Sequence, residues 1–345
     1  MRRFSKKNDA VNTMISWFLI LVLLSSVTAA ILLGSKTAID NSKNKTVTTV
    51  IGKAFEEFDK NIKDLLPSCP TQGDAEFAID KGSLQVDSKG SRIVVMYSYS
   101  DAFDFFVENA ESIDFDVDNA DAVEAKLKVK ITKFPAIDTA EKYTDHKDTS
   151  IISDGSGALM QLRHVEYPLD TASGDDPAYE EVAFASIWIF DLGRMIYNNP
   201  GGNIEKIIYE NCAIIKDDLE NAYVDYSSNI ENEGNNVIQL SVGLIRRGGN
   251  IAEVTNAGVY TVDFEVKNNS LRNKINTEVY NFKIMIKGDY ATEWYDYLTA
   301  SNLRTFDFTE RTTPNGEKFL WFNNGEKTDL VFSTYVTQIN DISIS

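Results

Sequence analysis

Three aspartates, Asp114, Asp116 and Asp118, stand two residues apart in the sequence. A calcium ion requires several oxygen ligands at close quarters, so these three carboxylates are the candidate metal ligands. The tight-turn glycine of a calcium loop is replaced by Asn119, and the twelfth position is Ala125. The pattern therefore favours a strand with an acidic exposed face over a calcium loop, and we assign no metal or other cofactor to the chain.

A serine hydrolase requires a nucleophile on a strained turn and a histidine base. The segment Gly155-Ser156-Gly157 lacks the spacing of that turn, and the chain has two histidines, His146 and His164. His146 lies in a charged segment and His164 in an expected strand. We therefore expect no enzyme.

The two cysteines, Cys69 and Cys212, could form a disulfide if the chain is exported, because the environment outside the cytoplasm is oxidising. Such a bridge would close a loop of more than 140 residues. Chain-entropy arguments give it about 4 to 5 kcal/mol of stabilisation. Two buried thiols are the alternative, and the sequence leaves both open.

Two triplets match the N-glycosylation pattern. They begin at Asn44 and Asn268, both in segments that we expect to be exposed. Chance occurrence in an Asn-rich chain is the alternative.

The charge balance excludes one class of partner. The 345 residues carry a formal net charge of −18. An acidic chain without a Lys/Arg stripe has no electrostatic footprint for phosphate backbones, so we expect no nucleic-acid partner.

The N-terminal region predicts a membrane or bundling helix. No charged residue occurs from Ala10 to Ser35, a run of 26 residues, which as a helix would span about 39 Å. Basic residues precede the run and the acidic bulk follows it, which places the remainder outside the cytoplasm. A cleaved secretory signal and a plain signal anchor are the alternatives to an assembly helix. The apolar residues of the expected anchor or assembly surface are Val11, Met14, Ile15, Trp17, Phe18, Leu19, Ile20, Leu21, Val22, Leu23, Leu24, Ile31, Leu32 and Leu33.

An amphipathic stalk is predicted next. Apolar residues recur every three or four positions between Val47 and Leu66, while Glu56, Asp59 and Lys63 are expected on the opposite face. Pro67 is expected to end this helix. Residues 10–66 would then form one rod of about 85 Å.

This arrangement resembles the type IV pilin-like proteins of archaea. The basic leader, residues 1–9, ends at Asp9, and the apolar segment begins at Ala10 and Val11. The resemblance implies cleavage near Asp9-Ala10 by a prepilin-type peptidase, with the pilus machinery as a further partner. The ectodomain resembles archaeal pilin-like envelope proteins through the segments 165–168, 178–180 and 290–297.

The exported part, residues 67–345, is predicted to be β-rich. Alternation of apolar and polar residues is clearest in 125–131, 260–266 and 280–286. We expect an α+β fold in which the long N-terminal hydrophobic helix precedes a mainly antiparallel head, either a sandwich or an open barrel. A short helix is expected from Tyr290 to Leu298 with Asp289 as its cap. One elaborated head is preferred to two domains, with a possible sub-boundary near 217–236.

These features together predict a structural cell-surface protein, a type IV pilin-like or pseudopilin subunit. Its N-terminal helix would contact membrane lipid or other copies of itself, and its head would lie outside the cytoplasm or in an extracellular filament. The alternative is a monomeric, signal-anchored extracellular binding module.

Overall fold

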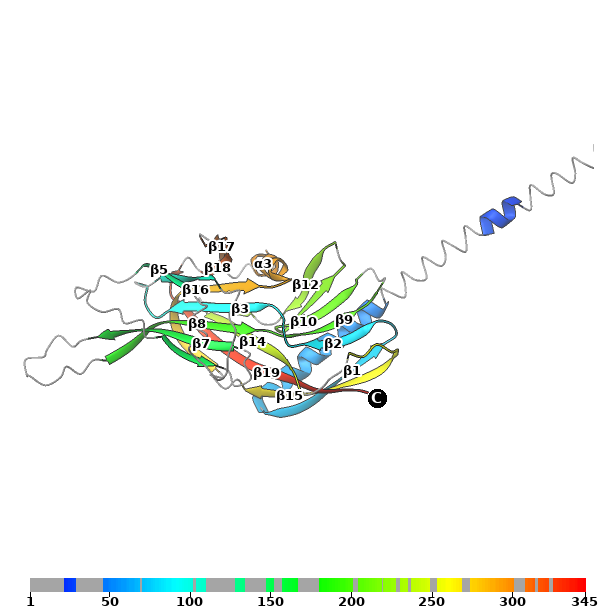
Figure 1. Cartoon of the computed structure of the whole chain (residues 1–345), viewed down its shortest axis with the longest axis horizontal. Helices are drawn as coiled ribbons and strands as arrows, with labels where there is room; N and C mark the ends of the chain where they lie inside the picture. The colour runs from blue at the N-terminus through cyan, green and yellow to red at the C-terminus, as the bar shows by residue number, and fades with distance from the viewer. Residues whose placement is uncertain are drawn as a thin grey trace, which may run out of the picture.

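The architecture is mainly antiparallel β-sheet with few helices, as the sequence predicts. Figure 1 shows this arrangement of strands and helices in the computed structural model of the chain. The described residues are 22–28, 46–68, 70–101, 104–109, 128–133, 147–151, 157–166, 180–200, 204–218, 220–227, 230–234, 237–248, 253–268, 274–300, 308–313, 316–322 and 325–345.

The largest sheet has 12 strands. Its main path runs through β1 (Thr71–Ile79), β15 (Gly258–Asn268), β19 (Thr328–Ile344), β16 (Lys274–Lys287), β3 (Arg92–Ser98), β8 (Glu180–Asp191), β7 (Gly157–Glu166) and β6 (Lys147–Ile151). Four more strands join it, in the pairs β14 (Val237–Arg247) on β19, β13 (Ile230–Gly234) on β14, β18 (Lys318–Phe322) on β16 and β17 (Phe308–Thr312) on β18. Among the strand pairs that the structure describes, only β14 with β19 is parallel.

A second sheet has five strands. In order they are β12 (Ala222–Ser227), β11 (Ala213–Asp217), β10 (Lys206–Glu210), β9 (Arg194–Asn198) and β2 (Ser83–Asp87). A separate pair consists of β4 (Asp104–Asn109) and β5 (Lys128–Lys133). The polar segment 217–236, considered above as a boundary, contains β12 of the five-stranded sheet and β13 of the large one.

The described helical segments are residues 22–28, residues 46–65, the short 3-10 turn η1 (Leu66–Ser68) and α3 (Ala291–Thr299). The helix expected near Tyr290 is therefore present, but the expected cap is wrong. Tyr290 is the N-cap of α3 and makes no side-chain cap bond. Asp289 instead forms an ion pair with Arg194, with 3.2 Å between Oδ2 and Nη1.

The five-stranded sheet is covered on both faces. Side chains alternate across a strand, so Ile208 and Ile215 join one apolar core with α3 and the large sheet. Tyr209 and Ile214 join a second core on the opposite face. The head therefore contains two buried apolar layers that share one thin sheet.

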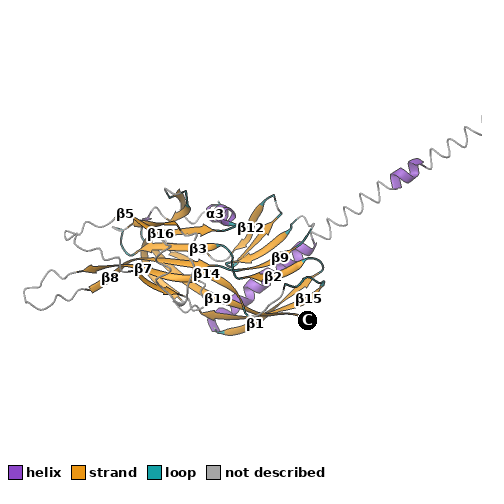
Figure 2. Cartoon of the chain, viewed as in Figure 1, coloured by secondary structure: helices purple, strands orange, loops and turns teal. Residues whose placement is uncertain are grey.

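The helix 46–65, which we call the stalk helix, lies in the second core. It runs between the strands β1 and β15 of the large sheet and the five-stranded sheet (Figure 2). Ile51, Phe55, Phe58 and Ile62 are fully buried, which matches the spacing of one helix face. The helix is thus an internal layer of the head along these residues.

Candidate functional site

The junction between the stalk helix and the head is built from aromatic rings. The Phe58 ring lies edge-on to Phe77, Phe264 and Tyr209, with ring centroids 6.4, 5.0 and 5.1 Å away. Phe55 stacks on Tyr209 with the centroids 6.1 Å apart. Rings from one helix therefore contact both sheets, so the helix cannot leave without opening the second core.

A buried carboxylate fixes the helix on the same side. Asp59 is 0% exposed, although its position in the sequence predicts the helix face opposite the apolar residues. Its Oδ1 accepts a 2.7 Å hydrogen bond from the Tyr209 hydroxyl, and its Oδ2 accepts one of 3.1 Å from Tyr226. The Lys63 ammonium lies 2.9 Å from the same Oδ2. Three directed contacts on one carboxylate define both the rotation and the axial position of the helix.

The charges at this junction alter two neighbouring groups. Burial of Lys63 acts to lower its pKa, but the hydrogen bond and the charge of Asp59 outweigh it and raise the pKa above its ordinary value. Burial raises the pKa of Tyr209 well above its ordinary value, with Cys212, Tyr335 and Asp59 adding to the shift. Tyr209 therefore stays a neutral hydrogen-bond donor.

Cys212 occupies the tight turn between β10 and β11. Asn211 and Cys212 have φ values of 49° and 59°, a pair of left-handed residues that suits a two-residue hairpin turn. The Cys212 sulfur is buried 2.7 Å from the Tyr335 hydroxyl oxygen, and burial raises the pKa of the thiol to about 12. Cys69 lies outside the described residues, so the disulfide stays a prediction.

A second buried carboxylate, Glu210, lies on the opposite face of the five-stranded sheet. Its Oε2 accepts a 2.8 Å hydrogen bond from the backbone N–H of Ser91, and its Oε1 accepts one of 3.4 Å from the Trp294 indole. These bonds join β10 to the start of β3 and to α3. Burial raises the pKa of Glu210, while the Ser91 bonds and the charge of Arg194 act against that shift.

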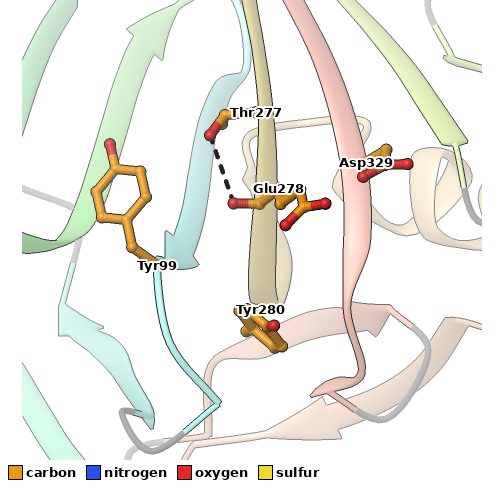
Figure 3. Close-up of a pocket in the computed structure, with 5 residues that line it drawn as sticks. All are labelled: Tyr99, Thr277, Glu278, Tyr280 and Asp329. Carbon is orange, nitrogen blue, oxygen red and sulfur yellow. Dashed lines mark hydrogen bonds between the residues drawn. The ribbon is translucent and has the colours of Figure 1, made fainter.

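An open hollow of about 680 Å³ lies beside β16. Its lining residues, shown in Figure 3, are Tyr99, Thr277, Glu278, Tyr280 and Asp329. Tyr99 directly follows β3, and Asp329 belongs to β19, so the hollow spans three neighbouring strands of the large sheet. The sequence carried no signal for this site because its residues are of common types and come from three distant segments.

Three of the expected anchor residues belong to the described chain. Val22, Leu23 and Leu24 lie in the helical segment 22–28 and are 49%, 65% and 61% exposed. The other residues of the expected anchor lie outside the described residues. In the described part of the chain, no helix has the length and apolar character needed to cross a membrane.

Several other predicted site residues also lie outside the described chain. These are Asp9 and Ala10 at the expected cleavage point, Asn44, Asp114, Asp116, Asp118, His146 and Ser156. Asn268 is the last residue of β15, and His164 lies within β7. The structure therefore brings none of these candidates together into a described site.

Four aromatic side chains of α3 and β18 are buried: Trp294, Tyr295, Phe319 and Phe322. Trp294 and Leu320 are fully buried, and Tyr295 is 4% exposed. The Tyr295 hydroxyl donates to the Lys318 carbonyl at 2.7 Å and accepts from the Ile286 N–H at 2.8 Å. These side chains hold α3 against β16 and β18.

Comparison with known proteins gives no match to any protein-family model, curated protein or solved structure.

Proposed function

We propose that the chain is a structural cell-surface protein, type IV pilin-like or pseudopilin-like, which is anchored or assembled through its N-terminal helix. The observation that carries this proposal is the position of the stalk helix. Its buried face lies between two sheets, and the contacts of Asp59 fix its orientation. On its N-terminal side, the helical residues 22–28 expose Leu23 and Leu24. A helix built into the head is a means of transmitting position and force from an anchor to that head.

The exposed apolar residues supply the anchoring chemistry. Apolar side chains at this density are stable in lipid or against identical helices, because both environments remove them from water. The partners of this segment are accordingly membrane lipid and further copies of the chain. If the leader is processed, a prepilin-type peptidase and the pilus machinery act on the same segment.

Synthesis of the chain in vitro with liposomes tests the anchor without requiring export. The wild-type chain should float with the vesicles and resist salt extraction. The double variant Leu21→Arg, Leu24→Arg should remain with the soluble or aggregated material, since each arginine costs about 2.5 to 3.5 kcal/mol at the centre of a membrane helix. Val50→Arg, at an exposed position of the stalk helix, is the matched control and should float like the wild type. Flotation of the double variant at the wild-type level would contradict the proposal.

A monomeric, signal-anchored binding module is the second candidate, and the hollow beside β16 favours it. The two functions differ at the N-terminus of the mature protein. Mass spectrometry of the native chain should find a start at Ala10 for a processed pilin-like subunit. Retention of Met1 or Arg2 would favour the signal-anchored module.

A further inference from the structure

The hollow beside β16 lies where that strand changes its partner. Residues Lys274 to Val279 of β16 pair with β19, and from Tyr280 onward the strand pairs with β3. The register with β3 shifts between Tyr280 and Lys283, and Asn281 has a φ of 53°. Bulges of this kind redirect side chains at functional positions of a sheet. The hollow therefore coincides with a local break in sheet regularity.

Hydrogen-bond acceptors and donors meet along one side of the hollow. Glu278 and Asp329 are direct cross-strand partners, which places two carboxylates side by side. Lys327 forms an ion pair with Glu278, and this contact raises the pKa of Lys327, with Tyr280 and Asp329 adding their charge effects. The Thr277 hydroxyl lies 3.4 Å from the main-chain oxygen of Glu278 (Figure 3). The volume is within the range of small-molecule sites.

Two tyrosines supply aromatic surface to the same hollow. The Tyr99 hydroxyl is 2.9 Å from the Ser186 hydroxyl, and the Tyr99 ring packs edge-on against Tyr97 at a centroid distance of 5.6 Å. These contacts hold Tyr99 in place before any ligand arrives. Tyr280 lines the hollow from β16 and is half-buried.

The lining discriminates between ligand classes. Carboxylates repel an anionic ligand, and an incoming cation would have to displace Lys327 from Glu278. A neutral polyhydroxyl ligand suits the lining residues, because its hydroxyls can donate to the two carboxylates and accept from the tyrosine and threonine hydroxyls. The faces of tyrosine rings are electron-rich and attract polarised C–H bonds, which line the faces of sugar rings.

We propose that the hollow lined by Tyr99, Tyr280 and Asp329 binds the sugar units of a neutral glycan. The open form of the hollow admits one or a few units of a longer chain. This site is independent of anchoring, so it goes beyond the proposed function and can stand or fail separately from it.

Ligand-observed NMR with the full chain tests the site. The protein is kept in a polyoxyethylene ether detergent, which contains no sugar, and is titrated separately with maltose, cellobiose, lactose, mannobiose and diacetylchitobiose. At least one disaccharide should give saturable binding. Tyr280→Ala and Asp329→Asn should each weaken that binding by about fivefold or more, through loss of the ring surface or of a charged acceptor.

Two matched control variants and a cationic probe, spermidine, complete the design. Tyr223→Ala removes an exposed tyrosine from β12, and Asp263→Asn removes an exposed carboxylate from β15; both should leave sugar affinity unchanged. Circular dichroism verifies that every variant is folded. If Tyr280→Ala does not fold, Asp329→Asn still tests the site. The proposal is overturned if no disaccharide binds, if binding is insensitive to both hollow variants, or if spermidine binds there and the sugars do not.

Discussion

Tyr209 and Glu210 are neighbours on β10, yet they belong to two different buried junctions. Tyr209 points to the stalk helix and donates to Asp59, whereas Glu210 points to the opposite face and accepts from Ser91 and Trp294. Each junction buries one carboxylate completely. The two faces of one sheet therefore bury a carboxylate with different sets of partners.

The two carboxylates differ in the charge that accompanies them. Asp59 has an ammonium in direct contact, from Lys63 on the same helix. Among the described residues, no cation lies within ion-pair distance of Glu210, and its pKa is raised. Breaking a buried ion pair leaves an uncompensated partner, whereas a carboxyl held by neutral donors can take up a proton instead. The stalk junction should therefore depend on charge and the α3 junction on pH.

Removal of the Phe58 ring should give the largest effect. Phe58→Ala deletes a fully buried side chain between three other rings and should lower the free energy of unfolding by about 3 to 5 kcal/mol. Val50→Ala, at a position 42% exposed on the same helix, should change it by less than about 0.5 kcal/mol. Urea unfolding measures both. Equal effects would show that the helix is not an internal layer.

Asp59→Asn should give a smaller loss that isolates charge from shape. The amide keeps one acceptor for the two tyrosine hydroxyls but loses the attraction to Lys63, so we expect about 1 to 3 kcal/mol of destabilisation. Glu56→Gln removes a carboxylate from the exposed face of the same helix and is the matched control. Urea unfolding at neutral pH compares the two variants. A loss of stability in Asp59→Asn no larger than that in Glu56→Gln would show that the charge of Asp59 does not stabilise the junction.

Glu210→Gln should change the pH dependence of stability rather than its size at one pH. A carboxyl with a raised pKa in the folded state binds more protons there than in the unfolded chain. Its contribution is complete below the unfolded pKa and is lost as pH rises toward the folded pKa. The variant should therefore gain stability relative to the wild type as the pH rises above about 4. A constant difference across that range would show that Glu210 does not titrate differently on folding.

The smallest expected effect is the chemical modification of Cys212. Its thiol is buried with a pKa of about 12, so iodoacetamide at pH 8 should not modify it in the native protein. After denaturation with reductant it should react, as peptide mass spectrometry can verify. Denaturation without reductant tests the bridge to Cys69 separately, because a sulfur in a disulfide does not react with iodoacetamide. Rapid modification in the native state would contradict the described position beside Tyr335.

Much of the fold follows from periodicity, and the exceptions have a physical cause. The strand β15 has one exposed face, alternates clearly and was predicted. The strand β1, whose burial also alternates, was not predicted. The strands β9, β10 and β11 were not predicted either, because both of their faces are buried and their sequences, such as Ile207-Ile208-Tyr209, are continuously apolar. The alternation test cannot detect strands of this kind. The layered arrangement with a helix between sheets was missed for the same reason.

The sites were harder to predict than the fold. The stripe of the stalk helix is visible in the sequence, but Asp59 is buried within it because Tyr209 and Tyr226, more than 140 residues away in sequence, provide its partners. The pair Glu278 and Asp329 exists only through the register of β16 with β19. Local patterns indicate which residues avoid water, whereas such pairings depend on long-range topology.

We expect the stalk helix to join the head to a segment that avoids water. Analytical ultracentrifugation of the full chain, transferred from detergent into buffer without it, measures this most directly when intact mass confirms that residues 10–35 are present. We expect association into large species or precipitation. A stable, soluble monomer with that segment intact would contradict it.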